Sequence, residues 1–93
     1  MTVRNNELTS LPNIGKVLAD KLEIVGIDTV EKLESIGIEN AFIRLKTIDN
    51  DVCINTLCAL EGAMQKIRWH NLDKSRKEEL KIFFEMTKRI DKK

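Results

Sequence analysis

The stretch "LPNIGKVLADKLEIVG", residues 11–26, decides the fold because it joins a sharp turn directly to a helix. A proline disfavours helical backbone in the residue before it, so Pro12 is expected to stop a short helical turn over residues 8–11. Asparagine, isoleucine and glycine at positions 13–15 then make the turn. Apolar residues at helical spacing follow, and they predict a helix over residues 16–25.

Glycines and capping residues divide the rest of the chain into further helices. Gly26 is expected to end the first helix in the left-handed conformation. Asp28 is expected to cap the next helix, with Glu31 as its reciprocal partner, and Gly37 is expected to end it. The pattern predicts further helices over residues 39–47, from about residue 52 to residue 67, and over residues 74–90 with Asn71 or Asp73 as the cap.

The helix that begins near residue 52 has the widest apolar face, which predicts a central position with several helices packed around it. Gly62 in its interior costs about 1 kcal/mol relative to alanine, so we expect another backbone to approach closely there. Cys53 and Cys58 lie about 140° apart on the same helix, too far for a disulfide. Both are expected to be buried, reduced thiols.

The composition favours an all-α protein. The chain has 93 residues, 42% of them hydrophobic and 33% charged, which is typical of one globular domain over residues 1–93 with flexible ends at 1–7 and 91–93. Aromatic residues make up only 4% and there is one proline, a poor composition for a β-sandwich. The net charge of +1 is far from strongly basic, so nucleic-acid binding would have to depend on local charge placement.

The sequence predicts no catalytic site, no metal site and no cofactor. His70 is the only histidine and has no partner at ligand spacing, and a single glycine in "NIGK" is not a nucleotide-binding loop. Glu61 is expected to form a salt bridge with Arg44 or Arg68 rather than to act in catalysis. No signal peptide and no apolar run near the ~20 residues of a membrane span is visible, so we expect a cytoplasmic protein without membrane contact.

The chain also resembles a known family. Residues 8–37 look like a helix-hairpin-helix element with its trailing helix, and "LCALEGAMQKIRWHNLDKSRKEEL", residues 57–80, extends the similarity. Over residues 8–85 the chain is similar to the C-terminal domain of the TfoX/Sxy-type competence regulators. The matching positions are Gly26, Ile27, Thr29, Leu33, Gly37, Ala41, Leu45, Leu57, Ala59, Leu60, Glu61, Gly62, Ala63, Trp69 and Leu72.

This resemblance implies a compact all-α bundle of about five helices that contains a helix-hairpin-helix-like element (SAM/HhH-like). In the full-length regulators it implies activation of genes for DNA uptake. Here a stand-alone domain is expected, because residues 1–7 cannot contain the other domain of those proteins. The turn departs from the usual Gly-x-Gly pattern: Asn13 stands at the first glycine, and asparagine tolerates left-handed backbone better than most residues.

Asn13, Ile14, Gly15 and Lys16 are the candidate nucleic-acid-binding residues. Amides of the last three lie at a helix N-terminus, where the helix dipole and the Lys16 ammonium favour a phosphate. Such a site would hold a DNA or RNA backbone without reading bases. In the alternative interpretation, Ile14 packs inside and the turn is only a connector.

A second set of cations surrounds Trp69 and His70. It is either another phosphate-contacting patch or, as we expect of most charge runs, a solvated face. Trp69 is expected to be a core anchor, with base stacking as the alternative. The members of the set are Lys66, Arg68, Lys74, Arg76 and Lys77.

The sequence therefore favours a non-enzymatic helical domain that binds DNA independently of sequence and has a regulatory role related to competence or transcription. The alternative is a protein-interaction module or a homodimer without nucleic-acid binding. Exposure of Phe83, Phe84 or Met86 on the last helix would favour that alternative, since a contiguous apolar surface usually marks a contact site.

Overall fold

The computed structural model describes residues 5–91, which contain helices and no strand. The predicted all-α class is therefore confirmed. Of the ends predicted to be flexible, residues 1–7 and 91–93, residues 1–4 and 92–93 lie outside the described residues, whereas residues 5–7 and 91 are helical. The elements are α1 (Asn5–Thr9), α2 (Lys16–Ile24), α3 (Val30–Ile36), α4 (Ile38–Ile48), α5 (Ile54–Gln65), the 3-10 turn η1 (Trp69–Asn71) and α6 (Lys74–Asp91).

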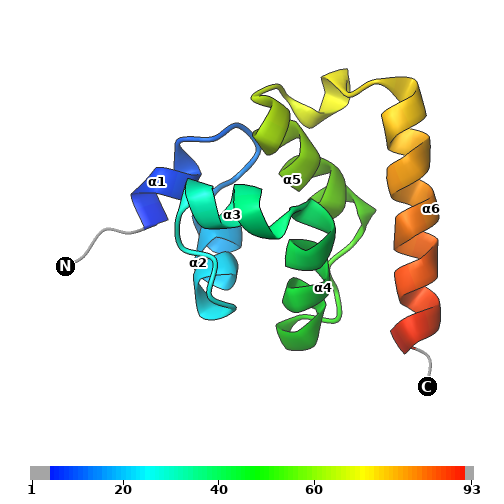
Figure 1. Cartoon of the computed structure of the whole chain (residues 1–93), viewed down its shortest axis with the longest axis horizontal. Helices are drawn as coiled ribbons and strands as arrows, with labels where there is room; N and C mark the ends of the chain where they lie inside the picture. Colours follow the sequence, from blue (N-terminus) through cyan, green and yellow to red (C-terminus); the bar gives the residue numbers. More distant parts are fainter. Residues whose placement is uncertain (1–4, 92–93) are drawn as a thin grey trace.

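Helix α5 occupies the centre of the molecule. Figure 1 shows it with α1 to α4 on one side and α6 on the other. It contacts α4, η1 and α6, while α2 contacts α1 and α4. This confirms the central position predicted from its wide apolar face. The completely buried large side chains are Phe42, Leu8, Leu22, Ile27, Leu33, Leu45, Leu57 and Leu60.

Helix α2 ends as the sequence predicts. Gly26 has a φ of 90°, in the region that favours glycine. The Ile27 amide donates to the Leu22 carbonyl at 2.8 Å and the Gly26 amide donates to the Glu23 carbonyl at 3.0 Å, the paired bonds of a Schellman motif. The Ile27 side chain is completely buried, so the cap also fixes the direction of the chain toward α3.

Helix α3 has a different cap from the one predicted. The Thr29 hydroxyl accepts from the Lys32 amide at 3.1 Å, because α3 begins at Val30 and an N-cap side chain reaches the third helical amide. Asp28 lies one residue too early and instead pairs with the Lys32 ammonium at 2.9 Å. The prediction of Asp28 as the cap with Glu31 as its partner is wrong.

Helix α5 begins two residues later than predicted. Cys53 is its N-cap residue and has extended backbone, so its side chain does not lie on the apolar face of the helix. Cys53 is exposed and Cys58 is buried, and neither forms a disulfide. The expectation that Cys53 is buried is therefore wrong. Burial raises the pKa of the Cys58 thiol above its usual value.

Helix α6 packs against α5 through one face. Leu80 and Thr87 are buried, and the Thr87 hydroxyl donates to the Phe84 carbonyl at 2.7 Å. At the start of α6 the Lys77 amide donates to the Asp73 carbonyl at 2.9 Å, so Asp73 holds the cap position. Asn71, the other residue predicted for that role, lies in η1.

Candidate nucleic-acid interface

The turn between α1 and α2 has the backbone that the sequence predicts. Asn13 has a φ of 71°, in the left-handed region. Gly15 is the N-cap residue of α2, with an extended φ of −95° and ψ of −174° that any residue can adopt. The small size of Gly15, and not its backbone freedom, is therefore its useful property.

The residues at the start of α2 lie at the surface. Gly15, Lys16 and Val17 are all exposed, and no residue in the described part of the chain accepts a hydrogen bond from their amides. The bonding of α2 starts with the Ala19 amide, which donates to the Gly15 carbonyl at 3.0 Å. An open N-terminus of this kind carries unsatisfied donors and partial positive charge, and it can accept an anion.

The four predicted site residues divide between two sides of the turn. Gly15 and Lys16 lie on the outer side, where the Lys16 side chain is 80% exposed and its ammonium lies 3.1 Å from the Asp20 carboxylate. Ile14 is buried, so its side chain anchors the turn, as in the connector interpretation. Asn13 also turns its side chain inward. Of the four predicted residues, only Gly15 and Lys16 therefore lie where an external ligand could contact them.

The Asn13 side chain joins the hairpin to a distant loop, a role that the sequence did not reveal. Its Nδ2 donates to the Ile67 carbonyl at 2.9 Å and to the Ala59 carbonyl at 3.5 Å. Its Oδ1 accepts from the Trp69 amide at 3.2 Å. A Cβ on Gly62 would lie 2.8 Å from the Ile67 carbonyl oxygen, so the predicted close approach of another backbone is confirmed, and it would lie 2.6 Å from Asn13 Nδ2 as well.

A groove of about 990 Å³ runs beside the hairpin, between α2, the loop after α4 and the start of α5. Lys21 lies in it and bonds to the Asp49 carboxylate across the groove. Hydrogen bonds from Lys21 and from the Asp51 amide hold the pKa of Asp49 below its usual value. The wall opposite α2 carries two carboxylates, Asp49 paired with Lys21 and the exposed Asp51, so it is less favourable for a phosphate than the α2 side.

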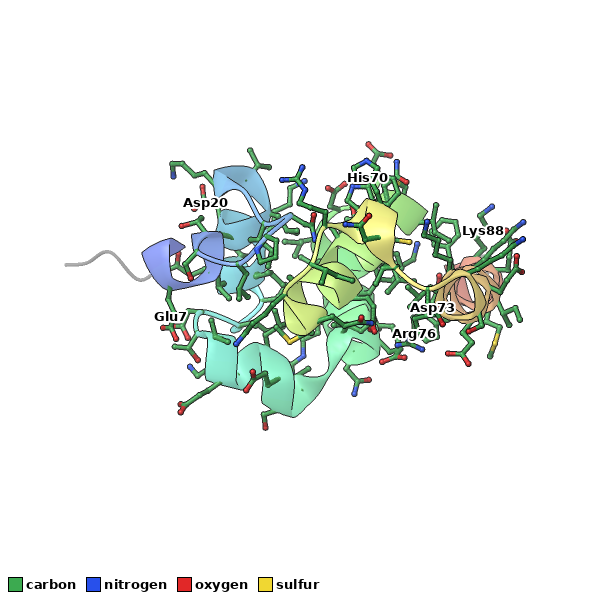
Figure 2. All side chains as sticks on the ribbon, turned by 90° about the horizontal axis from the view of Figure 1, so that it is seen from above. Glu7, Asp20, His70, Asp73, Arg76 and Lys88 are labelled. Atoms are coloured by element: carbon green, nitrogen blue, oxygen red, sulfur yellow. The ribbon has the colours of Figure 1, made fainter. Side chains whose placement is uncertain are left out.

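Arg76 is the most heavily neutralised cation of the second basic set. It bonds to Glu79 at 2.9 Å, Glu61 at 3.0 Å and Glu39 at 3.4 Å, and so ties α6 to α4 and α5. In Figure 2, Arg76 lies between α6 and the rest of the molecule. The predicted partners of Glu61 are wrong: its partner is Arg76.

Glu61 has a structural role in this cluster. Burial raises the pKa of Glu61, but hydrogen bonds from Arg76 and Gln65 outweigh burial and lower it overall. The same pairing raises the pKa of Arg76. Arg44, one of the expected partners, instead donates to the Val25 carbonyl at 3.2 Å.

The remaining cations of the set are open. Lys66, Arg68 and Lys74 are exposed, and none has an acidic partner among residues 5–91. The Lys77 ammonium donates to the His70 carbonyl at 3.2 Å. The expectation of a solvated face therefore fits most of this set, while Arg76 belongs to an internal ion-pair cluster.

The described part of the chain has neither a metal-binding cluster nor a membrane-spanning helix. It holds no group of three or more side chains suited to a metal ion. Every helix within residues 5–91 is too short or too polar to cross a bilayer.

Comparisons with known proteins agree with the fold. A crystal structure of an uncharacterized protein from Listeria monocytogenes, in a triclinic form, is 48% identical, with a TM-score of 0.85 over 87% of this chain and 92% of that chain. A tetragonal-form structure of a protein of unknown function from the same organism is 49% identical, with a TM-score of 0.81 over 84% and 96%. No curated protein matches. A family model described as the TfoX C-terminal domain matches residues 4–84, and the chain therefore belongs to the TfoX C-terminal domain family.

Proposed function

We propose that this domain binds the phosphate backbone of nucleic acid at the N-terminus of α2, without reading base sequence and without catalysis. The observation that carries the proposal is that Gly15, Lys16 and Val17 are exposed residues whose amides have no acceptor in the described part of the protein. Lys16 adds a cationic side chain on the same turn, and its solvent-exposed pair with Asp20 is weak enough for a phosphate to compete with it. Backbone amides and a lysine contact phosphate but carry no information about bases.

Membership of the TfoX C-terminal domain family supports a regulatory role related to competence, in which DNA is the relevant nucleic acid. The Listeria monocytogenes proteins add support for the fold only, since they are described as uncharacterized and of unknown function. The regulatory part of the proposal therefore depends on the family, and the binding part depends on the hairpin.

A titration with fluorescein-labelled duplex DNA at 50 and 200 mM salt tests the proposal. Binding should weaken steeply with salt, because phosphate contacts release counterions. Lys16→Glu should weaken binding about tenfold, because it places a carboxylate at the phosphate position. Lys81→Glu is the matched control, since Lys81 is an exposed lysine of α6, and Figure 1 shows α6 on the opposite side of the molecule from α2.

If Lys16→Glu and Lys81→Glu weaken DNA binding equally, the loss comes from the change in net charge alone, and this would contradict a binding site at the hairpin. Absence of binding by the unaltered protein at 50 mM salt would contradict nucleic-acid binding as a whole.

A protein-interaction module is the second candidate, and one observation favours it. Ile82 and Met86 on α6 are 61% and 55% exposed beside a shallow hollow of about 390 Å³. Phe83 and Phe84 add little, because they pack half-buried with their rings 6.4 and 5.9 Å from the Phe42 ring. Sedimentation equilibrium of the protein and of Ile82→Glu would reveal a homodimer through this face.

A further inference from the structure

The loop between α5 and α6 presents a pair of stacked aromatic rings. The Trp69 and His70 rings lie 4.2 Å apart between centroids and 25° from parallel. Trp69 is partly buried and packs against the core, whereas His70 is exposed. The stack therefore runs from the core outward, and Figure 2 shows His70 at the surface.

The backbone that carries these rings is held from several sides. The Asn71 amide donates to the Arg68 carbonyl at 2.9 Å, which closes the η1 turn, and Leu72 after it is buried. Asn13 accepts from the Trp69 amide, and Lys77 donates to the His70 carbonyl. The exposed ring is thus positioned before any ligand arrives, so a ligand that stacks on it loses little entropy in ordering the protein.

Positively charged residues flank the two rings in the sequence. Residues 66–77 contain five lysines or arginines and one acidic residue, Asp73. Carboxylates neutralise Arg76, whereas Lys66, Arg68 and Lys74 are exposed and have no acidic partner within residues 5–91. An aromatic surface flanked by open cations matches the two chemical parts of a single nucleic-acid strand, an unpaired base and its phosphates.

We infer that the loop over residues 66–70 binds single-stranded nucleic acid, with one unpaired base stacked on the His70 ring and the flanking phosphates near Lys66 and Arg68. This inference rests on the proposed function and deepens it by naming the class of nucleic acid. Asn13 of the hairpin bonds directly to this loop, at the Ile67 carbonyl and the Trp69 amide, so the two segments lie next to each other. A duplex keeps its bases paired and stacked, and gains only the phosphate contacts.

The test compares an oligo(dT) strand and an oligo(U) strand of about 12 nucleotides with a DNA duplex of the same length, at low salt. His70→Ala should weaken binding of the single strands about tenfold and change binding of the duplex by less than about twofold. His70→Phe keeps a stacking surface and should retain single-strand binding. His70 is exposed and contacts Trp69 through its ring, so His70→Ala removes that contact whereas His70→Phe keeps an aromatic ring at the position.

Trp69 supplies a second readout. It is the only tryptophan in the chain, so its fluorescence reports on the stack without a label. We expect the single strand to change this fluorescence in the unaltered protein, and the duplex to change it little. Binding of the oligo(dT) or the oligo(U) strand that is weakened by His70→Ala and kept by His70→Phe supports the inference.

The outcomes separate the two proposals. If His70→Ala binds single strands as well as the unaltered protein does, the stacking inference is overturned. The hairpin site then still stands, provided that Lys16→Glu weakens binding. If the duplex binds more tightly than the single strands, the inference is also overturned. If no nucleic acid binds, both proposals fail.

Discussion

The α1–α2 hairpin has an inner face against α5 and an outer face toward solvent, and the two differ most clearly at the glycine beside each, Gly62 of α5 on the inner face and Gly15 on the outer face. On the inner face, a Cβ at Gly62 would lie 2.6 Å from Asn13 Nδ2 and 2.8 Å from the Ile67 carbonyl oxygen. On the outer face, a Cβ at Gly15 would meet nothing within 4 Å. The inner face holds the fold together, and the outer face leaves room for a ligand.

This difference makes the two interpretations of the hairpin compatible: the turn can be a structural connector and a phosphate-binding site at the same time. The buried Ile14 side chain and the bonded Asn13 side chain make the turn a structural connector. The amides of Gly15 and Lys16 remain open on the other side. A turn that packs through its side chains can therefore still present its backbone, because the two groups point in different directions.

The largest effect is expected at Asn13. Asn13→Ala removes the hydrogen bonds to Ile67 and Trp69 and places alanine in left-handed backbone, so it should lower the free energy of unfolding by about 3 kcal/mol. Asn13→Gly keeps the backbone freedom and loses only the bonds, so about 2 kcal/mol is expected. Urea unfolding measures both. Equal stability of Asn13→Ala and the unaltered protein would show that the inner face contributes little.

A smaller loss is expected at Gly62. Alanine is the better helix former by about 1 kcal/mol, so Gly62→Ala would stabilise an uncrowded helix. Here the new methyl group would press on Asn13 and the Ile67 carbonyl, and we expect the free energy of unfolding to fall by about 2 kcal/mol. The sign of the change in a urea titration decides the question. A gain in stability would mean that the inner face is loosely packed.

The smallest effect on stability is expected at Gly15. Alanine is a poorer N-cap than glycine, but it also reduces the entropy of the unfolded chain, so Gly15→Ala should change the free energy of unfolding by less than about 0.5 kcal/mol. A methyl group there would nevertheless keep a phosphate away from the amides, and the affinity for DNA should fall severalfold. Unchanged affinity for DNA in this variant would show that DNA does not bind at the outer face of the hairpin.

The helices and most of their ends were predictable because they depend on residues close together in the sequence. Pro12, Gly26 and Gly37 act through their own backbone preferences, and the structure has turns or helix ends at all three. The errors at Asp28 and Cys53 also have local causes. Because α3 begins one residue later than expected, Thr29 caps it in place of Asp28. Because α5 begins two residues later than expected, Cys53 precedes the helix and its side chain is exposed.

The candidate site was predictable only in part. The left-handed turn at Asn13 and the open start of α2 follow from the residue types in "NIGK". The stacked Trp69 and His70 rings were not predicted, although adjacent aromatic residues among lysines and arginines were a visible signal. Whether a ring faces the core or solvent depends on what packs beside it.

The sequence by itself determined an all-α chain with a turn of asparagine and glycine opening into a helix, because backbone preferences and apolar spacing act over a few residues. Only the tertiary structure decided that Asn13 bonds to groups 46 to 56 positions away and that Glu61 pairs with Arg76. The physical reason is that a side chain bonds to whichever partner packing brings within about 3 Å, and that choice is made when the helices dock.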